Sequence, residues 1–202
     1  FVGEVYGSIL ILWVILLLMG SLFLGRRVLS LPKFIREPIL LAFSTASSEA
    51  AYPKTLQGLK RFGCSEKISS FVLPVGYSFN LDGSMMYCTF ATMFIAQAYG
   101  IEITIAQQIT MLLLLMVTSK GMAGVPRASL VVIAAAMAQF HIPEAGLLLL
   151  LGVDHFLDMA RSATNVMGNA IASSVVAKLE GELTEPTDDD EDLLDDAVLV
   201  KE

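Results

Sequence analysis

Residues 5–25 form an apolar stretch without a charged side chain, and this stretch limits the possible folds more than any other part of the sequence. As an α-helix, a stretch of this length crosses about 30 Å of hydrocarbon. It ends at Arg26 and Arg27, and Lys33 and Arg36 follow. Because basic residues collect on the cytoplasmic side of membrane helices, the sequence predicts that this end of the span faces the cytoplasm.

The composition is that of a membrane protein. Charged residues make up 16% of the 202 residues, against about 25% in soluble domains, and the mean hydropathy is +0.68. The net charge of −7 does not describe the whole chain, because much of it comes from acidic residues between positions 180 and 196. We expect residues 181–202 to form a disordered, acidic, cytoplasmic tail. The charge pattern does not indicate nucleic-acid binding.

The next segment, residues 38–59, begins with an apolar run, 38–43, that is too short to cross the membrane. Its middle, 44–53, is rich in small and hydroxylated residues and ends with a proline. Basic residues flank both sides, so both ends are expected in the cytoplasm. We interpret residues 35–60 as a re-entrant helical hairpin whose tip lies inside protein. The alternative is a cytoplasmic loop with two surface helices.

Residues 68–99 are apolar again, but Asn80-Leu-Asp-Gly-Ser84 interrupts them with residues that favour turns. This pattern is typical of a discontinuous transmembrane helix, whose free carbonyls and half-helix ends bind ions or substrate. A kinked helix without a ligand is the alternative.

Residues 104–141 resemble the first hairpin, with two short apolar arms around a tip of glycine and proline, 119–129. Glu102 marks the extracellular side, so this second hairpin is expected to enter from outside. The alternative is a helix pair that crosses the whole membrane. Two hairpin-and-span units with opposite entry sides would form an inverted repeat, which is a transporter architecture.

A polar stripe marks the last apolar segment, expected to be helical over about residues 144–178. At 100° per residue, five polar side chains share one helix face. They are Asp154, Asp158, Arg161, Asn165 and Asn169. Intramembrane charges of both signs on one face are usually functional. The alternatives are a solvated surface stripe or an ion pair that only holds helices together.

Three motifs in this order resemble one known family. Asn80–Ser84, Ser119–Pro126 and Asp154–Gly168 are similar to the dicarboxylate/amino acid:cation symporters, the glutamate transporter family, and most of all to its proton/glutamate members. The tip Thr45–Pro53 resembles the family's first hairpin more loosely. The resemblance covers about residues 1–180.

The resemblance implies an all-α membrane protein with two re-entrant hairpins, a broken helix and an inverted repeat. Residues 1–30 would be the last transmembrane helix of a scaffold, and residues 31–180 the transport core. Because the chain begins at Phe1, we expect it to be the C-terminal part of a longer protein. That protein would be a multi-pass protein of the plasma membrane, which in a bacterium is the inner membrane. It would form a homotrimer through scaffold segments outside this sequence.

Substrate-binding roles follow from the chemistry, and the family assigns the same ones. Arg161 can grip a side-chain carboxylate with two parallel hydrogen bonds, and Asp158 can hold an α-ammonium. Asn165 would donate to the α-carboxylate, and Ser162 would add a hydroxyl. The resemblance also assigns substrate contacts to both hairpin tips and the break; these residues are Ser47, Ser48, Ser84, Val125 and Ser129.

The expected substrate is glutamate or aspartate, because a plain dicarboxylate would leave Asp158 facing an anion. No cofactor is expected besides a coupling proton or sodium ion. The candidate cation or proton residues are Glu49, Gly76, Asn80, Asp82, Asn165 and Asn169. Sodium is the only metal ion that the sequence suggests as a ligand.

Two departures from the family pattern favour proton coupling. Asn169 stands where sodium-coupled members carry an aspartate, and Glu49 places an acid at the first tip. A carboxyl in an occluded tip can carry a proton near neutral pH. Asp82 would take this role if Glu49 reaches water. Arg127 stands where small residues are usual, and the sequence gives no reason for it.

Other functions remain open at this point. The family contains sodium-coupled amino-acid and C4-dicarboxylate symporters. A membrane protease could use Asp82 and Asp154 as a dyad that shares a proton. A third possibility is a structural or regulatory membrane fragment without transport activity. The protease does not account for Arg161, Asn165 or the two re-entrant tips.

Overall fold

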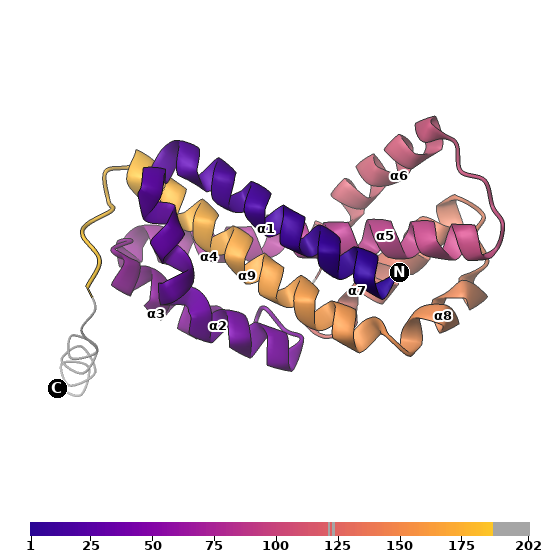
Figure 1. The fold of residues 1–202 in the computed structure, drawn as a ribbon, viewed down its shortest axis with the longest axis horizontal. Coiled ribbons are helices and arrows are strands. Elements are labelled where there is room, and N and C mark those ends of the chain that lie inside the picture. The colour runs from indigo at the N-terminus through magenta and orange to yellow at the C-terminus, as the bar shows by residue number, and fades with distance from the viewer. Residues whose placement is uncertain (121, 123, 188–202) are drawn as a thin grey trace.

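The structure is a computed structural model, and it describes residues 1–120, 122 and 124–187 (Figure 1). Most of the described residues are helical and none of them lies in a strand, which confirms the all-α prediction for them. In chain order, the elements are α1 (Val2–Leu24), η1 (Gly25–Ser30), α2 (Leu31–Thr45), α3 (Tyr52–Phe62), α4 (Glu66–Phe79), α5 (Asp82–Ala98), α6 (Ile105–Thr118), α7 (Ala128–Gln139), η2 (Glu144–Leu147), α8 (Leu148–Leu151) and α9 (Asp154–Leu179).

Helix α9 is the centre of the molecule. Helices α1, α2, α4 and α5 all pack against it, and most of its residues are buried. Its sequence suits this position, because small residues such as Ala163, Gly168 and Ala170 let neighbouring helices approach closely. The buried polar side chains of such a helix therefore need partners within the protein.

Helix α1 lies along α9 (Figure 1). The continuous helical run from Val2 to Thr45 contains the one segment, among the described residues, that is long and apolar enough to cross a membrane. Trp13 Nε1 donates to Thr164 Oγ1 at 2.9 Å, and Tyr6 donates to the Phe156 carbonyl at 2.7 Å. Helix α1 therefore packs directly along α9. Hydropathy cannot indicate which neighbour an apolar helix meets.

Two helical hairpins approach each other from opposite ends of the molecule (Figure 1). Helices α2 and α3 form the first, with its tip at residues 46–51, and α6 and α7 form the second. In the second tip, residues 124–127 include the groups that contact the first tip and α9. Ser47 Oγ donates to the Gly124 carbonyl at 2.9 Å, and the Glu49 N–H donates to the same carbonyl at 3.3 Å. The two tips therefore meet at mid-molecule.

The expected break lies where Asn80 and Leu81 leave helical geometry, between α4 and α5. The Asn80 N–H still bonds the Gly76 carbonyl at 2.7 Å, so α4 keeps its last turn. Helix α5 then begins at Asp82 with its first N–H groups free for partners.

The last apolar segment is not one helix from residue 144. The 3₁₀ turn η2 and the single turn α8 come first, and α9 begins only at Asp154. Pro143 starts this irregular stretch, and Gly152 and Val153 end it. Glycine and proline disfavour a continuous helix, and here they interrupt it although the surrounding run is apolar.

The segment 181–187, expected to belong to a disordered tail, lies instead across the α3–α4 turn. The Thr184 N–H donates to the Gly63 carbonyl at 2.9 Å, and the Ser65 N–H donates to Glu182 at 3.1 Å. These backbone bonds satisfy groups that the turn leaves free. The rest of the predicted tail, residues 188–202, lies outside the described residues.

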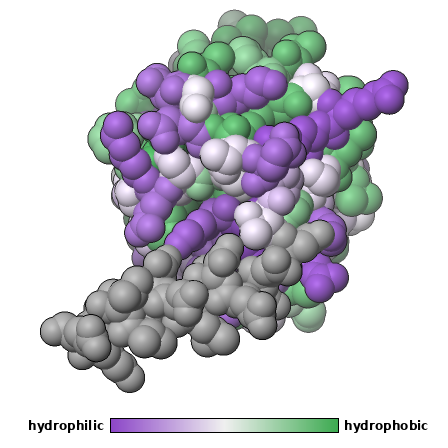
Figure 2. Space-filling model, turned by 90° about the vertical axis from the view of Figure 1, so that its left-hand side faces the viewer, coloured by the Kyte–Doolittle hydropathy of each residue, from purple (hydrophilic) through white to green (hydrophobic). Residues whose placement is uncertain are grey.

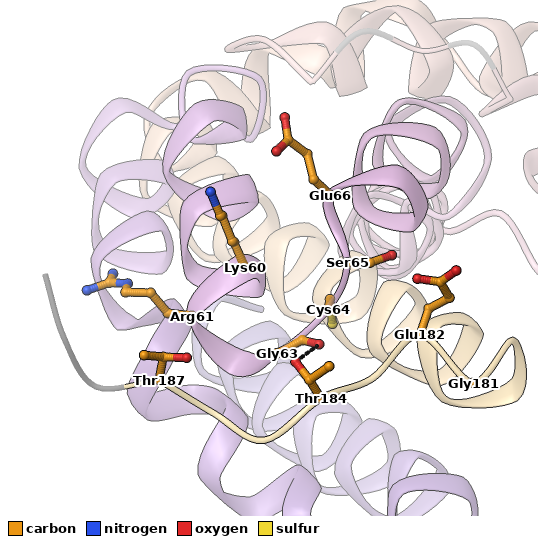
Figure 3. Close-up of a pocket in the computed structure, with 10 residues that line it drawn as sticks. All are labelled: Lys60, Arg61, Gly63, Cys64, Ser65, Glu66, Gly181, Glu182, Thr184 and Thr187. Atoms are coloured by element: carbon orange, nitrogen blue, oxygen red, sulfur yellow. Dashed lines mark hydrogen bonds between the residues drawn. The ribbon is translucent and has the colours of Figure 1, made fainter. Parts of the chain in front are cut away.

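Hydrophilic residues gather over this end of the molecule (Figure 2). A hollow of about 340 Å³ lies between the C-terminal segment and the α3–α4 turn (Figure 3). Arg27 donates to the carbonyls of Phe62 and Thr184, so it ties η1 to both parts. This end carries the basic residues that the sequence places in the cytoplasm.

The Trp13–Thr164 bond gives a test of how α1 is held. We expect Trp13→Phe to lower the free energy of unfolding in detergent by about 1 kcal/mol, because one hydrogen bond is lost. On a Thr164→Val background the same change should cost almost nothing. An equal cost in both backgrounds would contradict the packing of α1 described here.

Candidate functional site

The polar stripe of α9 is buried. Asp154, Asp158, Arg161 and Asn165 have no exposed surface, and Asn169 is 1% exposed. A solvated surface stripe is therefore wrong for this chain. Burying charged groups is costly unless they find partners, so the contacts of each one define the site.

Arg161 is the largest buried side chain of the stripe and lies between three elements. Its Nε forms an ion pair with Asp158, one turn earlier on the same helix. Nη1 donates to Ser84 Oγ at 2.9 Å, and Nη2 donates to the Val125 carbonyl at 3.3 Å. The guanidinium thus reaches the start of α5 and the second tip from α9.

Asn165 joins α9 to the start of α5. Its Oδ1 accepts from the N–H groups of Gly83 at 3.0 Å and Ser84 at 3.3 Å, and its Nδ2 donates to Ser84 Oγ at 2.9 Å. The amide therefore caps free N–H groups at the first turn of α5. The backbones approach closely here, because a Cβ on Gly83 would lie 2.8 Å from Thr164 Cβ.

Two residues that the sequence reasoning left without a role complete the acidic side of the site. The Tyr87 hydroxyl donates to Asp154 Oδ1 at 2.6 Å. The Arg127 N–H donates to Asp158 Oδ2 at 2.8 Å, and its Nε lies 3.9 Å from Asp154 Oδ2. The sequence signal for Tyr87 was its position in the apolar run of α5. A buried tyrosine hydroxyl there needs a hydrogen-bond partner.

The first tip meets the second through Glu49 as well as Ser47. Glu49 Oε1 accepts from the Gly124 N–H at 2.8 Å, and the Glu49 side chain is otherwise exposed. Ser48, Ser129 and Ser162 each bury a hydroxyl that makes no hydrogen bond to the described residues. Such groups are available to a polar ligand.

A second polar cluster lies at the helix break, toward the other end of the stripe. One end of the Asn80 amide lies 3.2 Å from Asn169 Oδ1, and its other end lies 3.2 and 3.3 Å from the two Asp82 carboxylate oxygens. Gly76 and Gly168 leave room for these side chains. A Cβ on Gly76 would lie 3.0 Å from Asn169 Cγ, and one on Gly168 would lie 2.5 Å from Asp82 Oδ2.

Hollows reach this cluster from two sides. One of about 320 Å³ is lined by Asn80, Asp82 and Lys120, and another of about 410 Å³ is lined by Asn80, Asp82 and Gly168. Lys120 also donates to the Phe79 carbonyl at the end of α4. Within residues 1–120, 122 and 124–187, no three His, Cys, Asp or Glu side chains gather as metal ligands would. The oxygen donors at the break suit a singly charged cation or a proton.

The proposed protease dyad does not form. Asp82 faces Gly168, whereas Asp154 begins α9, 14 positions earlier. At 1.5 Å per residue these points on α9 are about 21 Å apart. Two acids that share a proton need direct contact, so this arrangement excludes Asp82 and Asp154 as a catalytic pair.

A helical membrane chain with opposite charges buried at mid-molecule, between two hairpin tips and a broken helix, has the features of a secondary transporter. The sodium:dicarboxylate symporter family model matches residues 1–179, so the chain belongs to this family.

Individual relatives agree with this assignment. The chain is 50% identical over 161 residues to the proton/sodium-glutamate symport protein of Geobacillus stearothermophilus, covering 80% of this chain and 38% of the relative. It is 50% identical over 156 residues to the proton/glutamate-aspartate symporter of Escherichia coli, covering 77% and 36%. A C4-dicarboxylate transport protein of Bordetella avium is 44% identical over 183 residues, covering 90% and 41%. The chain therefore spans about two fifths of these relatives' length.

The close approach of Gly168 to Asp82 gives a test of the second cluster. We expect Gly168→Ala to lower the free energy of unfolding in detergent by about 1–3 kcal/mol, because the added methyl must displace the carboxylate or part the helices. Gly152→Ala is the matched control, since a Cβ there meets no atom within 4 Å. Equal stability of the two variants would contradict the contact.

Proposed function

We propose that this chain forms the transport core of an ion-coupled symporter for acidic amino acids, glutamate or aspartate. The observation that carries the proposal is the buried pair of Arg161 and Asp158 between the second tip and α5. The relatives named as glutamate symporters support the same substrate class.

The charges of the site fit the charges of the substrate. An acidic amino acid brings a side-chain carboxylate for Arg161 and an ammonium for Asp158, so it can replace their contact with each other by two new ion pairs. Both buried charges then keep a partner, as burial requires. The hydroxyls of Ser48, Ser129 and Ser162 would satisfy the remaining carboxylate oxygens.

A C4-dicarboxylate is the second candidate, because some relatives are named as its transporters. Such a substrate has no ammonium, so Asp158 would face an anion unless it took up a proton. The presence of Asp158, with Oδ2 directed to the second tip, favours the amino acid.

The two hairpins are proposed to be re-entrant and to form, with their following helices, an inverted repeat in the plasma membrane. Their entry from opposite ends and their contact at Gly124 support this arrangement. We also propose, on the family resemblance alone, that residues 1–30 form the last helix of the scaffold and residues 31–180 the transport core. A homotrimer is proposed on the family resemblance alone.

Proton coupling is proposed through Asp82 rather than Glu49. Glu49 reaches water, whereas Asp82 is half-buried, shares the Asn80 amide with Asn169 and is reached by hollows. An amide at position 169 supplies no charge to compensate sodium. A proton needs only the one carboxylate at the break.

The substrate is tested by uptake of labelled glutamate into vesicles that contain the complete gene product. Arg161→Ala should reduce glutamate affinity roughly a hundredfold, because a buried, charge-assisted contact is lost. Arg36→Ala, which removes an exposed guanidinium, should leave affinity unchanged. Unchanged affinity in Arg161→Ala would refute the assignment.

Hairpin topology is tested by labelling in a variant without Cys64 and Cys88. A cysteine at the exposed Gln57 should react with an impermeant reagent only from the cytoplasm, and one at the exposed Gln107 only from outside. Both positions reacting from one side of intact cells would overturn the inverted repeat.

The coupling ion is tested with imposed gradients. Inward proton gradients should drive uptake without sodium, and Asp82→Asn should abolish this response while exchange of internal for external glutamate continues. Glu49→Gln should keep the response, because Glu49 is exposed. Strict sodium dependence would defeat proton coupling, and loss of the response in Glu49→Gln alone would move the carrier to Glu49.

A further inference from the structure

Arg127 is the charged residue that the family pattern does not explain, and the structure gives it two contacts with α9. Its backbone lies in the left-handed region, at φ 65° and ψ 4°. Residues other than glycine adopt this conformation rarely, because Cβ crowds the following carbonyl. Something in the surrounding structure must hold the turn there.

The guanidinium supplies that restraint. Arg127 Nε lies 3.9 Å from Asp154 Oδ2, an oxygen that accepts no hydrogen bond from the described residues. Asp154 has no exposed surface, and its other oxygen is held by Tyr87. A buried carboxylate with one hydrogen bond needs a cation nearby. Arg127 is the cation within ion-pair distance among the residues that the structure describes.

The left-handed turn has a consequence for the substrate site. It directs the Arg127 N–H to Asp158 Oδ2 at 2.8 Å, two residues after the Val125 carbonyl that accepts from Arg161 at 3.3 Å. Both charged groups proposed to bind substrate thus receive a backbone contact from residues 124–127. The Arg127 side chain pairs instead with Asp154 and is 63% exposed.

We propose that Arg127 is a positioning residue for substrate specificity. Its ion pair with Asp154 holds residues 124–127 over Asp158 and Arg161 in the conformation that fits an acidic amino acid. The pair also balances charge, because Asp154 and Asp158 are matched by Arg127 and Arg161. Without Arg127 the site has a net negative charge, which opposes an anionic substrate.

The first test measures the KM for glutamate uptake in Arg127 variants, and it rests on the proposed function. Arg127→Gln should raise KM roughly tenfold with a smaller change in the maximal rate, and Arg127→Lys should restore most of the affinity. Arg127→Gly should be as poor as Arg127→Gln, although glycine relieves the backbone and keeps the N–H. Wild-type affinity in Arg127→Gly would show that only the backbone matters and overturn the proposal.

A double-mutant cycle tests the partner. In an Asp154→Asn background, Arg127→Gln should raise KM much less than in the wild type, since the ion pair is already lost. Arg36→Gln is the matched control for removing a guanidinium elsewhere. Additive effects of the two substitutions would exclude Asp154 as the partner.

A measurement without substrate separates this inference from the proposed function. With Cys64 and Cys88 replaced, cysteines at Ser48 and Gly124 should cross-link, because a Cβ on Gly124 contacts Ser48 Oγ. Arg127→Gln should slow this cross-linking roughly tenfold, and Arg127→Lys should not. If glutamate is not transported but cross-linking follows this order, the substrate assignment fails, whereas the positioning of residues 124–127 by Arg127 stands. An unchanged rate in Arg127→Gln refutes that role.

Discussion

The ion pair between Asp158 and Arg161 is the interaction on which the rest of the structure depends. Both side chains are fully buried in a chain whose surface is largely apolar, where an isolated charge would be very costly. Mutual contact offsets part of that cost, but a guanidinium has five N–H groups and a carboxylate accepts several bonds. The remaining bonds come from Ser84, Val125 and Arg127.

These remaining bonds explain the irregular parts of the fold. A continuous helix has no spare backbone groups, so a backbone bond to a buried charge comes from a break or a helix end. The start of α5 therefore faces Asn165 and Arg161, and the second tip faces Asp158. The first tip then holds the second through Gly124. An irregular backbone at mid-molecule is thus a requirement of the charged stripe.

The polar stripe of α9 carries two different clusters of polar groups along one helix. Opposite charges lie around Asp158 and Arg161, whereas Asn169 meets Asn80 and Asp82 at the break. Asn165 lies between them and caps the start of α5, which therefore contacts both clusters. This shared element offers a physical basis for the proposed coupling of a substrate to an ion.

The sequence by itself determined the features that depend on local pattern. An uncharged stretch of membrane length, turn residues at Asn80–Ser84 and a 100° repeat of polar side chains are enough to predict a helical membrane chain, a break and a buried polar face. Such patterns reflect propensity and solubility over a few turns. They therefore singled out Arg161, Asn165 and Asp82 as candidates, whereas the candidates at the hairpin tips came from the family resemblance.

Only the tertiary structure decided which groups meet. The pairing of Arg127 with Asp154 and of Tyr87 with the same acid, the packing of α1 on α9, and the exposure of Glu49 depend on contacts between distant segments. The late start of α9 and the C-terminal segment on the α3–α4 turn are also results of such packing. The physical reason is that a buried polar group takes whatever partner the assembled helices bring within reach, and helical periodicity gives a direction but no partner.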